Sequence, residues 1–240
     1  MELPFFTLLL LISFAAVNAV LFTPALPQIA SYFQIIPEEA SLGVTFFLIG
    51  YTLCQLLYGP LANRFGRKPT LIIGILIQIL SSVLCAISGW MGSFHLLVLG
   101  RFFLAIGSGV GLKMTFTMVN ETYPAKIAAQ KTSHLMLAFA IAPGLAVAIG
   151  GFLCSHFAWP SCFWAGALYG VILLIMVCSL PETATKLDPK ALQISYLKKA
   201  YAQKFRNKAL VAGSLLMGCT SSFIYTFSSI GPFISKNYFG

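Results

Sequence analysis

The stretch "YGPLANRFGRKP" (residues 58–69) concentrates charge in a chain of which only 9% of residues are charged. Gly59 and Pro60 end one apolar run and a second run starts just after the stretch, so residues 61–69 predict a very short loop between two helices. Gly59 lets neighbouring helices approach closely, and Gly66 permits a tight turn. The three cations fall within five positions, at Arg64, Arg67 and Lys68.

Apolar residues dominate the chain on both sides of this loop. Hydrophobic residues make up 58% of the 240 residues, and the mean hydropathy is +0.88. A bilayer core about 30 Å thick needs roughly 20 apolar residues per helix, and backbone polar groups inside it must be paired within the segment. The predicted fold class is therefore an all-α membrane protein. Seven stretches qualify as spans: 5–25, 41–60, 70–90, 94–119, 132–155, 161–180 and 208–233.

The cations predict the orientation of these spans. Because cytoplasmic loops retain Lys and Arg, a basic set in alternate connections predicts a multi-pass protein of the inner (plasma) membrane with a cytoplasmic amino terminus. The first span is expected to be retained, since Glu2 and no cation precede it. Nucleic acid is not an expected partner, because the cations share no single face. Twelve of the 15 cations lie in these connections: Arg64, Arg67, Lys68, Lys126, Lys131, Lys186, Lys190, Lys198, Lys199, Lys204, Arg206 and Lys208.

The longest polar stretch separates six spans from one. We therefore predict a six-helix bundle over residues 1–181, a basic cytoplasmic linker over 182–207, and a seventh transmembrane helix over 208–240. The linker is predicted either as an amphipathic helix on the inner membrane surface or as a solvated basic connection. One helix after a long linker looks like the start of a second bundle, so a truncated chain with a missing carboxy-terminal half is expected.

The segment "GPLANRFGRKP" (59–69) resembles the loop signature of the major facilitator superfamily, which joins helices two and three. The resemblance implies a six-helix amino-terminal bundle followed by helix seven, and a loop that latches the two halves on the cytoplasmic side. It assigns the gating role to Gly59, Asn63, Arg64, Gly66, Arg67 and Lys68. Asn63 stands where the family usually has an acid. Glu121, at the inner end of the fourth span, matches another position where the family often has an acid, and the resemblance makes it the expected partner of Arg64 or Arg67.

The fourth span, "LVLGRFFLAIGSGVG" (97–111), resembles a second family pattern, in which Arg101 is the cation. An arginine inside a span is costly unless it faces a cavity or a partner; the alternative is that it extends to the outer interface. Lys113 is predicted either to meet a polar or anionic substrate or to extend toward the inner headgroups. Arg101, Asn18 and Lys113 are the residues predicted to line a substrate path.

The fifth span, "LAFAIAPGLAVAIGGFL" (137–153), resembles the antiporter signature of drug:proton exporters, in the form found in the bicyclomycin- and chloramphenicol-resistance branch. "FTPALPQIASYF" (22–33) and "FIYTFSSIGPFI" (223–234) resemble that branch too. The proline bends a helix, and the glycines give a smooth surface to a moving neighbour. The predicted hinge consists of Pro143, Gly144, Gly150 and Gly151.

The predicted function is membrane transport: efflux of drugs or other small amphipathic compounds by alternating access, with protons as the coupling ion that the resemblance implies. The six acids lie at span ends or in loops, so no carboxylate is expected inside a span. The expected partners are the lipid bilayer and a small-molecule substrate. The alternative is a remnant or membrane interaction partner without transport of its own. No enzyme, metal or cofactor is expected, because no carboxylate pair, nucleophile motif or ligand spacing occurs.

Overall fold

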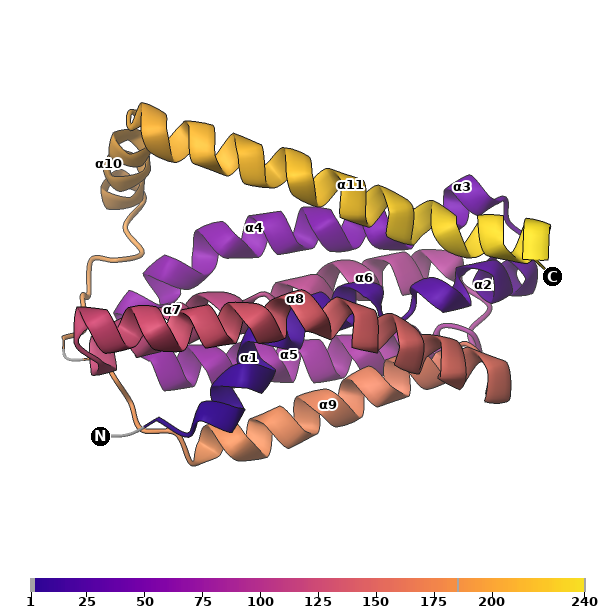
Figure 1. Cartoon of the computed structure of the whole chain (residues 1–240), viewed down its shortest axis with the longest axis horizontal. Coiled ribbons are helices and arrows are strands. Elements are labelled where there is room, and N and C mark those ends of the chain that lie inside the picture. The colour runs from indigo at the N-terminus through magenta and orange to yellow at the C-terminus, as the bar shows by residue number, and fades with distance from the viewer. Residues whose placement is uncertain (1–2, 185, 240) are drawn as a thin grey trace.

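The computed structural model describes residues 3–184 and 186–239 of the chain, and all regular structure in these ranges is helical (Figure 1). Seven helical segments in the described residues are long and apolar enough to cross a membrane. The elements are α1 (Phe5–Val20), η1 (Thr23–Ala25), α2 (Leu26–Phe33), α3 (Pro37–Ala40), α4 (Leu42–Phe65), α5 (Arg67–Ile87), α6 (Phe94–Ser108), α7 (Val110–Thr122), α8 (Ala125–His156), α9 (Pro160–Cys178), α10 (Ile194–Phe205) and α11 (Lys208–Phe239).

The predicted loop at residues 61–69 is wrong in length, because helix occupies nearly all of it. Helix α4 runs through Pro60 to Phe65, and α5 begins at Arg67. Gly66 alone joins them with a φ of 101°, a conformation that glycine adopts without steric cost. Pro60 has no N–H and cannot bond the Leu56 carbonyl. The Tyr201 hydroxyl of α10 donates to that oxygen instead.

The first span is broken near the end of the bundle at which Gly89 and Gly92 lie. This end is called the outer end below, and the end that holds Gly66 is called the inner end. Pro24 removes a backbone donor, and the Val20 carbonyl accepts a 2.8 Å bond from the Thr23 hydroxyl instead. Helix α1 therefore ends at Val20, and the chain continues as the short turn η1 and the helix α2. Residues 26–40, which lie between the first two predicted spans, are thus largely helical.

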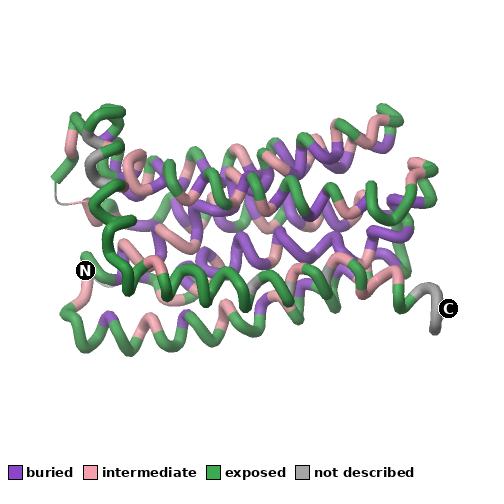
Figure 2. The backbone as a smooth tube through the Cα atoms, turned by 90° about the horizontal axis from the view of Figure 1, so that it is seen from above, coloured by how far each residue is buried: buried purple, intermediate pink, exposed green. Residues whose placement is uncertain are grey.

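The core lies between the helices of the six-span bundle, while their outward faces are exposed (Figure 2). Helix α5 packs against α6 and α9, α4 packs against α6, and α1 packs against α7 and α8. Many leucines and phenylalanines are exposed on the outward faces, as expected of helices whose surroundings are lipid. The bundle therefore has a buried core, and its outward surface is also apolar.

Helix α11 lies against the bundle at its outer end and joins α10 at its inner end (Figure 1). The outer contacts are with η1 and α2. Tyr225 and Phe233 of α11 pack against the buried core cluster of the bundle. In the inner half of α11, Leu210, Leu215 and Leu216 are exposed. The seventh span is therefore held at one end and open at the other.

Candidate functional site

A carboxylate caps the start of α5 at the inner end of the bundle. Glu182 accepts from the backbone N–H of Arg67 at 2.9 Å and of Lys68 at 3.0 Å, two of the amides that a helix leaves unpaired at its first turn. The positive end of the helix dipole also favours a carboxylate there. Burial raises the pKa of Glu182, but bonds from four backbone amides outweigh it and leave the pKa below its usual value. Sequence reasoning missed this cap.

Gly66 is required by this cap as well as by the turn. A Cβ at this position would lie 2.6 Å from Oε2 of Glu182, closer than two such atoms can approach. The Gly66 carbonyl in turn accepts from the Thr70 hydroxyl at 2.7 Å. A larger residue at 66 would therefore disturb both the turn and the carboxylate.

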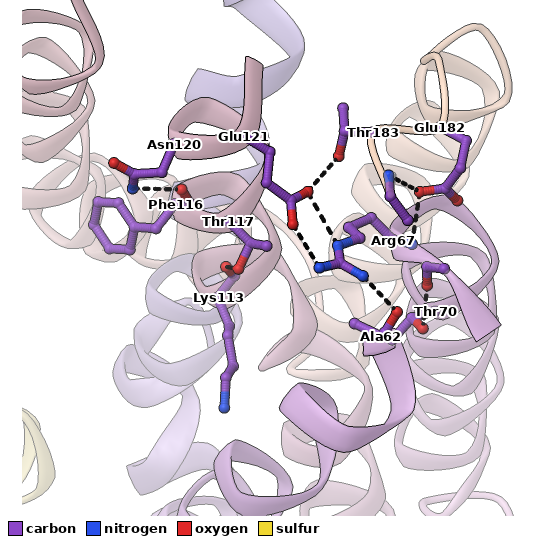
Figure 3. Close-up of polar contacts among 12 residues, drawn as sticks. Ala62, Arg67, Thr70, Lys113, Phe116, Thr117, Asn120, Glu121, Glu182 and Thr183 are labelled. Atoms are coloured by element: carbon purple, nitrogen blue, oxygen red, sulfur yellow. Dashed lines mark hydrogen bonds and ion pairs between the residues drawn. The ribbon is translucent and has the colours of Figure 1, made fainter. Parts of the chain in front are cut away.

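Arg67 forms a two-bonded ion pair with Glu121, a residue at the inner end of α7 (Figure 3). Nε lies 3.1 Å from Oε2, and Nη2 lies 2.5 Å from Oε1. The remaining nitrogen, Nη1, donates to the Ala62 carbonyl at 2.9 Å. The Thr183 hydroxyl donates to Glu121 at 2.9 Å. Of the two expected partners of Glu121, the structure pairs it with Arg67; Ala62, Arg67, Glu121, Glu182 and Thr183 are called the inner network below.

The other residues of the predicted gating loop contact the chain after α9. The Asn63 carbonyl accepts from the Asp188 N–H at 2.9 Å, and the Arg64 guanidinium donates to the Pro189 carbonyl. Lys68 Nζ lies 2.7 Å from the Cys178 carbonyl at the end of α9, where the helix dipole favours a cation. These contacts join the α4–α5 turn to the segment that leads into α10.

Arg101 is buried in the outer part of the bundle, with 1% of its surface exposed. Nη1 and Nη2 donate to the carbonyls of Asn18 and Ala19 at 2.8 and 3.1 Å, and Nε donates to Gly43 at 3.2 Å. The rings of Phe22 and Phe47 lie 3.7 and 4.4 Å from the guanidinium carbon, within the range of cation–π attraction. Arg101 thus binds carbonyls left unpaired where α1 ends, and it does not extend to the outer interface.

The side chain of Asn18 belongs to a second buried polar group. Its Oδ1 accepts from Nε2 of Gln78 at 2.9 Å, and its Nδ2 donates to the Phe14 carbonyl at 2.8 Å. Gln78 also donates to the Gly166 carbonyl at 3.0 Å. Gln78 was absent from the predicted site, although an amide within an apolar span is a signal, because it needs a partner there. These bonds link α1, α5 and α9.

The residues of the predicted hinge lie along α8, which continues through Pro143. Gly150 is in close contact with the first span: a Cβ there would lie 2.0 Å from the Leu21 carbonyl oxygen. Gly144 and Gly151 have open space at the same position. A cavity of about 760 Å³ separates α8 from the outer half of α11, and its lining includes Pro24, Gln28, Gly151 and Phe227. It is mostly apolar, as pockets for small molecules usually are.

Lys113 of α7 is half-buried, and its Nζ donates to the Gln55 carbonyl of α4 at 2.7 Å. Gly59 lies beside it, since a Cβ there would be 3.1 Å from Nζ. The structure does not bring Lys113 together with the buried Arg101 and Asn18. The predicted site residues therefore fall into four groups. These are the α4–α5 turn with the inner network, the buried group at Arg101 and Asn18, Pro143 and the glycines of α8, and Lys113 with Gly59.

Comparison with known proteins relates this arrangement to transporters. The profile of the Major Facilitator Superfamily matches residues 8–240. The multidrug resistance protein MdtL of Escherichia coli is 28% identical over 90% of this chain and 54% of its own length. A bicyclomycin resistance protein homolog of Haemophilus influenzae is 22% identical over 92% of this chain and 55% of its own length. The chain spans about half the length of these curated relatives.

A solved structure shares the fold. The crystal structure of a D-xylose-proton symporter matches with a TM-score of 0.73 at 17% identity, covering 97% of this chain and 61% of that chain. The six-span bundle and the seventh span thus have a known counterpart in shape.

Proposed function

We propose, from the premise that this chain belongs to the Major Facilitator Superfamily, that it forms the amino-terminal bundle (1–181), the linker (182–207) and the seventh helix (208–240) of an exporter. Its cargo would be drugs or other small amphipathic compounds, moved by alternating access. The chain is a multi-pass membrane protein by its seven spans and its family. Relatives described as resistance proteins support export as the direction of transport.

The inner network is the observation that carries this proposal. It joins the ends of α4, α5 and α7 to residues 182–183, the first two residues of the linker. This linker connects the amino-terminal bundle to the seventh helix, so a rocking motion of the two bundles would move the linker relative to the inner network. We therefore assign Gly59, Asn63, Arg64, Gly66, Arg67 and Lys68, with Glu121, to the joint that governs opening at the cytoplasmic side.

Other residues take roles along the path of the cargo. Asn18 and Arg101 hold the break in the first span that borders the path, and Lys113 faces it from the inner half. The glycines of α8 beside Pro143 form the surface on which the opposing helices move; open space at Gly144 and Gly151 supports this role. Protons are the proposed coupling ion, on the strength of the antiporter-like fifth span.

The proposed location is the inner (plasma) membrane, with the amino terminus in the cytoplasm. Basic residues on both sides of Gly66 and in the linker support this orientation. Fusion of alkaline phosphatase after Gly92 is expected to give an active reporter, and fusion after Ala184 an inactive one. The reverse pattern would contradict the orientation.

Efflux is tested with a chimera. Residues 1–240 are joined to the carboxy-terminal region of the Haemophilus influenzae homolog, starting where the match ends, and expressed in drug-sensitive bacteria. Accumulation of labelled bicyclomycin is expected to fall relative to cells with the vector, and a protonophore is expected to restore it. An Arg67→Gln chimera at equal membrane abundance is the matched control for the joint. A membrane-inserted chimera that lowers the accumulation of no tested drug would sink the proposal.

The second candidate is a membrane interaction partner without transport of its own. The exposed side chains of Leu215, Phe223 and Phe227 on α11 favour it, because they leave an apolar face available to another helix. The 240-residue chain reconstituted in liposomes is then expected to show no exchange of drug across the bilayer. Substrate exchange by this chain alone would refute the candidate.

A further inference from the structure

The geometry points to Lys113 as a cation that binds the acidic group of amphipathic organic anions at the inner half of the bundle. This inference rests on the proposed function and names the chemical class of its cargo. It begins from the cost of charge in a bilayer: an intramembrane cation is stable when it has an anion, a carbonyl or water as its partner.

The two cations within the fourth span have different surroundings. Arg101 is enclosed, with three carbonyl partners and two aromatic rings. Lys113 is half-buried, and a single hydrogen bond is described for its ammonium group, to Gln55. An ammonium group has three donors. Lys113 therefore has donors for another acceptor on a side chain that is still partly exposed, whereas Arg101 is enclosed by the protein.

The ammonium group stays at depth within the membrane. Gln55 precedes the inner end of α4 at Phe65 by ten residues, which at 1.5 Å per residue is about 15 Å. Lys113 reaches across to this carbonyl instead of extending toward the inner headgroups. An acceptor that meets it must therefore enter the bundle, as a cargo does and a headgroup does not.

The neighbouring carbonyl shows which side of the bundle Lys113 occupies. Leu56, the residue after Gln55, accepts from the Tyr201 hydroxyl of α10. Lys113 thus lies beside the point at which the linker helix touches α4. Leu210, Leu215 and Leu216 in the adjoining inner half of α11 are exposed, so this half does not pack into the bundle. The ammonium group lies on the side of the bundle toward α10 and α11.

The charged groups around Lys113 indicate which class of ligand it would bind. Glu121, the described carboxylate nearest along α7, is bonded to Arg67 and Thr183. The exposed leucines on the adjoining half of α11 and the ammonium group, for which no carboxylate partner is described, together fit a molecule with an apolar body and one acidic group. A charge-assisted bond is about twice as strong as a neutral one, so an anion is preferred over a neutral molecule of the same shape.

The test measures binding, which does not depend on transport. The 240-residue chain is placed in phosphatidylcholine nanodiscs, and equilibrium dialysis compares naphthalene-1-sulfonate with naphthalene-1-sulfonamide, a neutral analogue of similar shape. Empty nanodiscs give the blank. We expect the sulfonate to bind about tenfold more tightly, the size of one charge-assisted contact. Equal binding of the two probes to the unaltered chain would overturn the inference without any variant.

Variants then assign the preference to one residue. Lys113→Met keeps the length of the side chain and is expected to abolish the preference for the sulfonate, while Lys113→Arg is expected to keep it. Lys126→Met, at an exposed lysine of α8, is the matched control for the same loss of net charge. If Lys113→Met and Lys126→Met behave alike, the inference is wrong. A sulfonate preference without efflux by the chimera would instead defeat the proposed function and leave the anion site standing.

Discussion

Arg67 and Glu121, 54 residues apart in the sequence, meet through two parallel hydrogen bonds of 2.5 and 3.1 Å. The guanidinium and carboxylate groups match in geometry, which makes such a pair both strong and selective. Because Arg67 is buried with 8% exposure, water screens the pair only in part. The pair therefore ties the start of α5 to the end of α7.

A double-mutant cycle should detect this pair as a coupling energy. Arg67→Gln and Glu121→Gln are each expected to lower the free energy of unfolding, and the double variant to lose less than the sum. We expect a coupling of about 1–2 kcal/mol, measured by unfolding in detergent with tryptophan fluorescence. Additive losses would mean that the two side chains do not interact. Arg206→Gln, at an exposed linker residue, serves as the control.

Adjacent glycines of α8 should respond in opposite ways to the same change. Gly150→Ala is expected to destabilise the protein by about 1–3 kcal/mol, since its Cβ would lie 2.0 Å from the Leu21 carbonyl oxygen. Gly151→Ala has nothing within 4 Å of the new carbon and is expected to be neutral or to stabilise the helix by up to about 1 kcal/mol. Thermal unfolding of both variants checks this, and a larger loss at 151 than at 150 would contradict the packing of α8 on α1.

The carboxylate of Glu182 predicts a pH dependence of stability. Its pKa is lower in the folded chain because backbone amides bond the charged form. Its contribution is therefore complete above the unfolded value of about 4.3 and is lost as the pH falls through the folded pKa. Glu182→Gln should be less stable than the unaltered chain at pH 7 and should lose less on acidification toward pH 3. Unfolding curves across this range, with Glu38→Gln as the control, test the prediction; parallel curves for Glu182→Gln and the unaltered chain would refute it.

Replacement of the buried arginine by lysine should be costly although charge is conserved. Arg101→Lys replaces a planar fork that bonds three carbonyls with a single nitrogen. We expect a loss of about 2–4 kcal/mol in the free energy of unfolding. Arg206→Lys, an exposed arginine outside the bundle, should change stability by less than about 0.5 kcal/mol. A loss at 101 no greater than at 206 would mean that the three bonds contribute nothing.

Composition sufficed to predict the seven spans, because the length and hydropathy of a transmembrane helix are local properties. The helical breaks were harder. Pro60 looked like the end of a helix, yet α4 continues past it, and Tyr201, far along the chain, bonds the carbonyl that proline leaves free. The Tyr201 bond is a tertiary contact, and the residues around Pro60 do not reveal it.

The candidate site was likewise predictable only where a residue carries a signal of its own in the sequence. Glu121 could be named as a partner because it stands at the end of the fourth span, in a position where the family that the sequence resembles often has an acid. Glu182 lies 115 residues from the amide it caps, and neither residue marks the other in sequence. Gln78 and Asn18 likewise meet only after three helices have packed. Family resemblance identified the loop and the cations; the contacts that each of them makes came from the packed bundle.

The one-residue joint at Gly66 leaves no slack between α4 and α5. Glu182 caps the amides that follow Gly66, and Arg67 is paired with Glu121 of α7. The inner ends of α4, α5 and α7 are therefore joined to one another. A force on one of these helix ends would thus be passed on to the other two. Within the described residues 186–205, the linker contacts α4 through the Asp188 N–H, the Pro189 carbonyl and the Tyr201 hydroxyl, so a pull on α10 would act directly on α4.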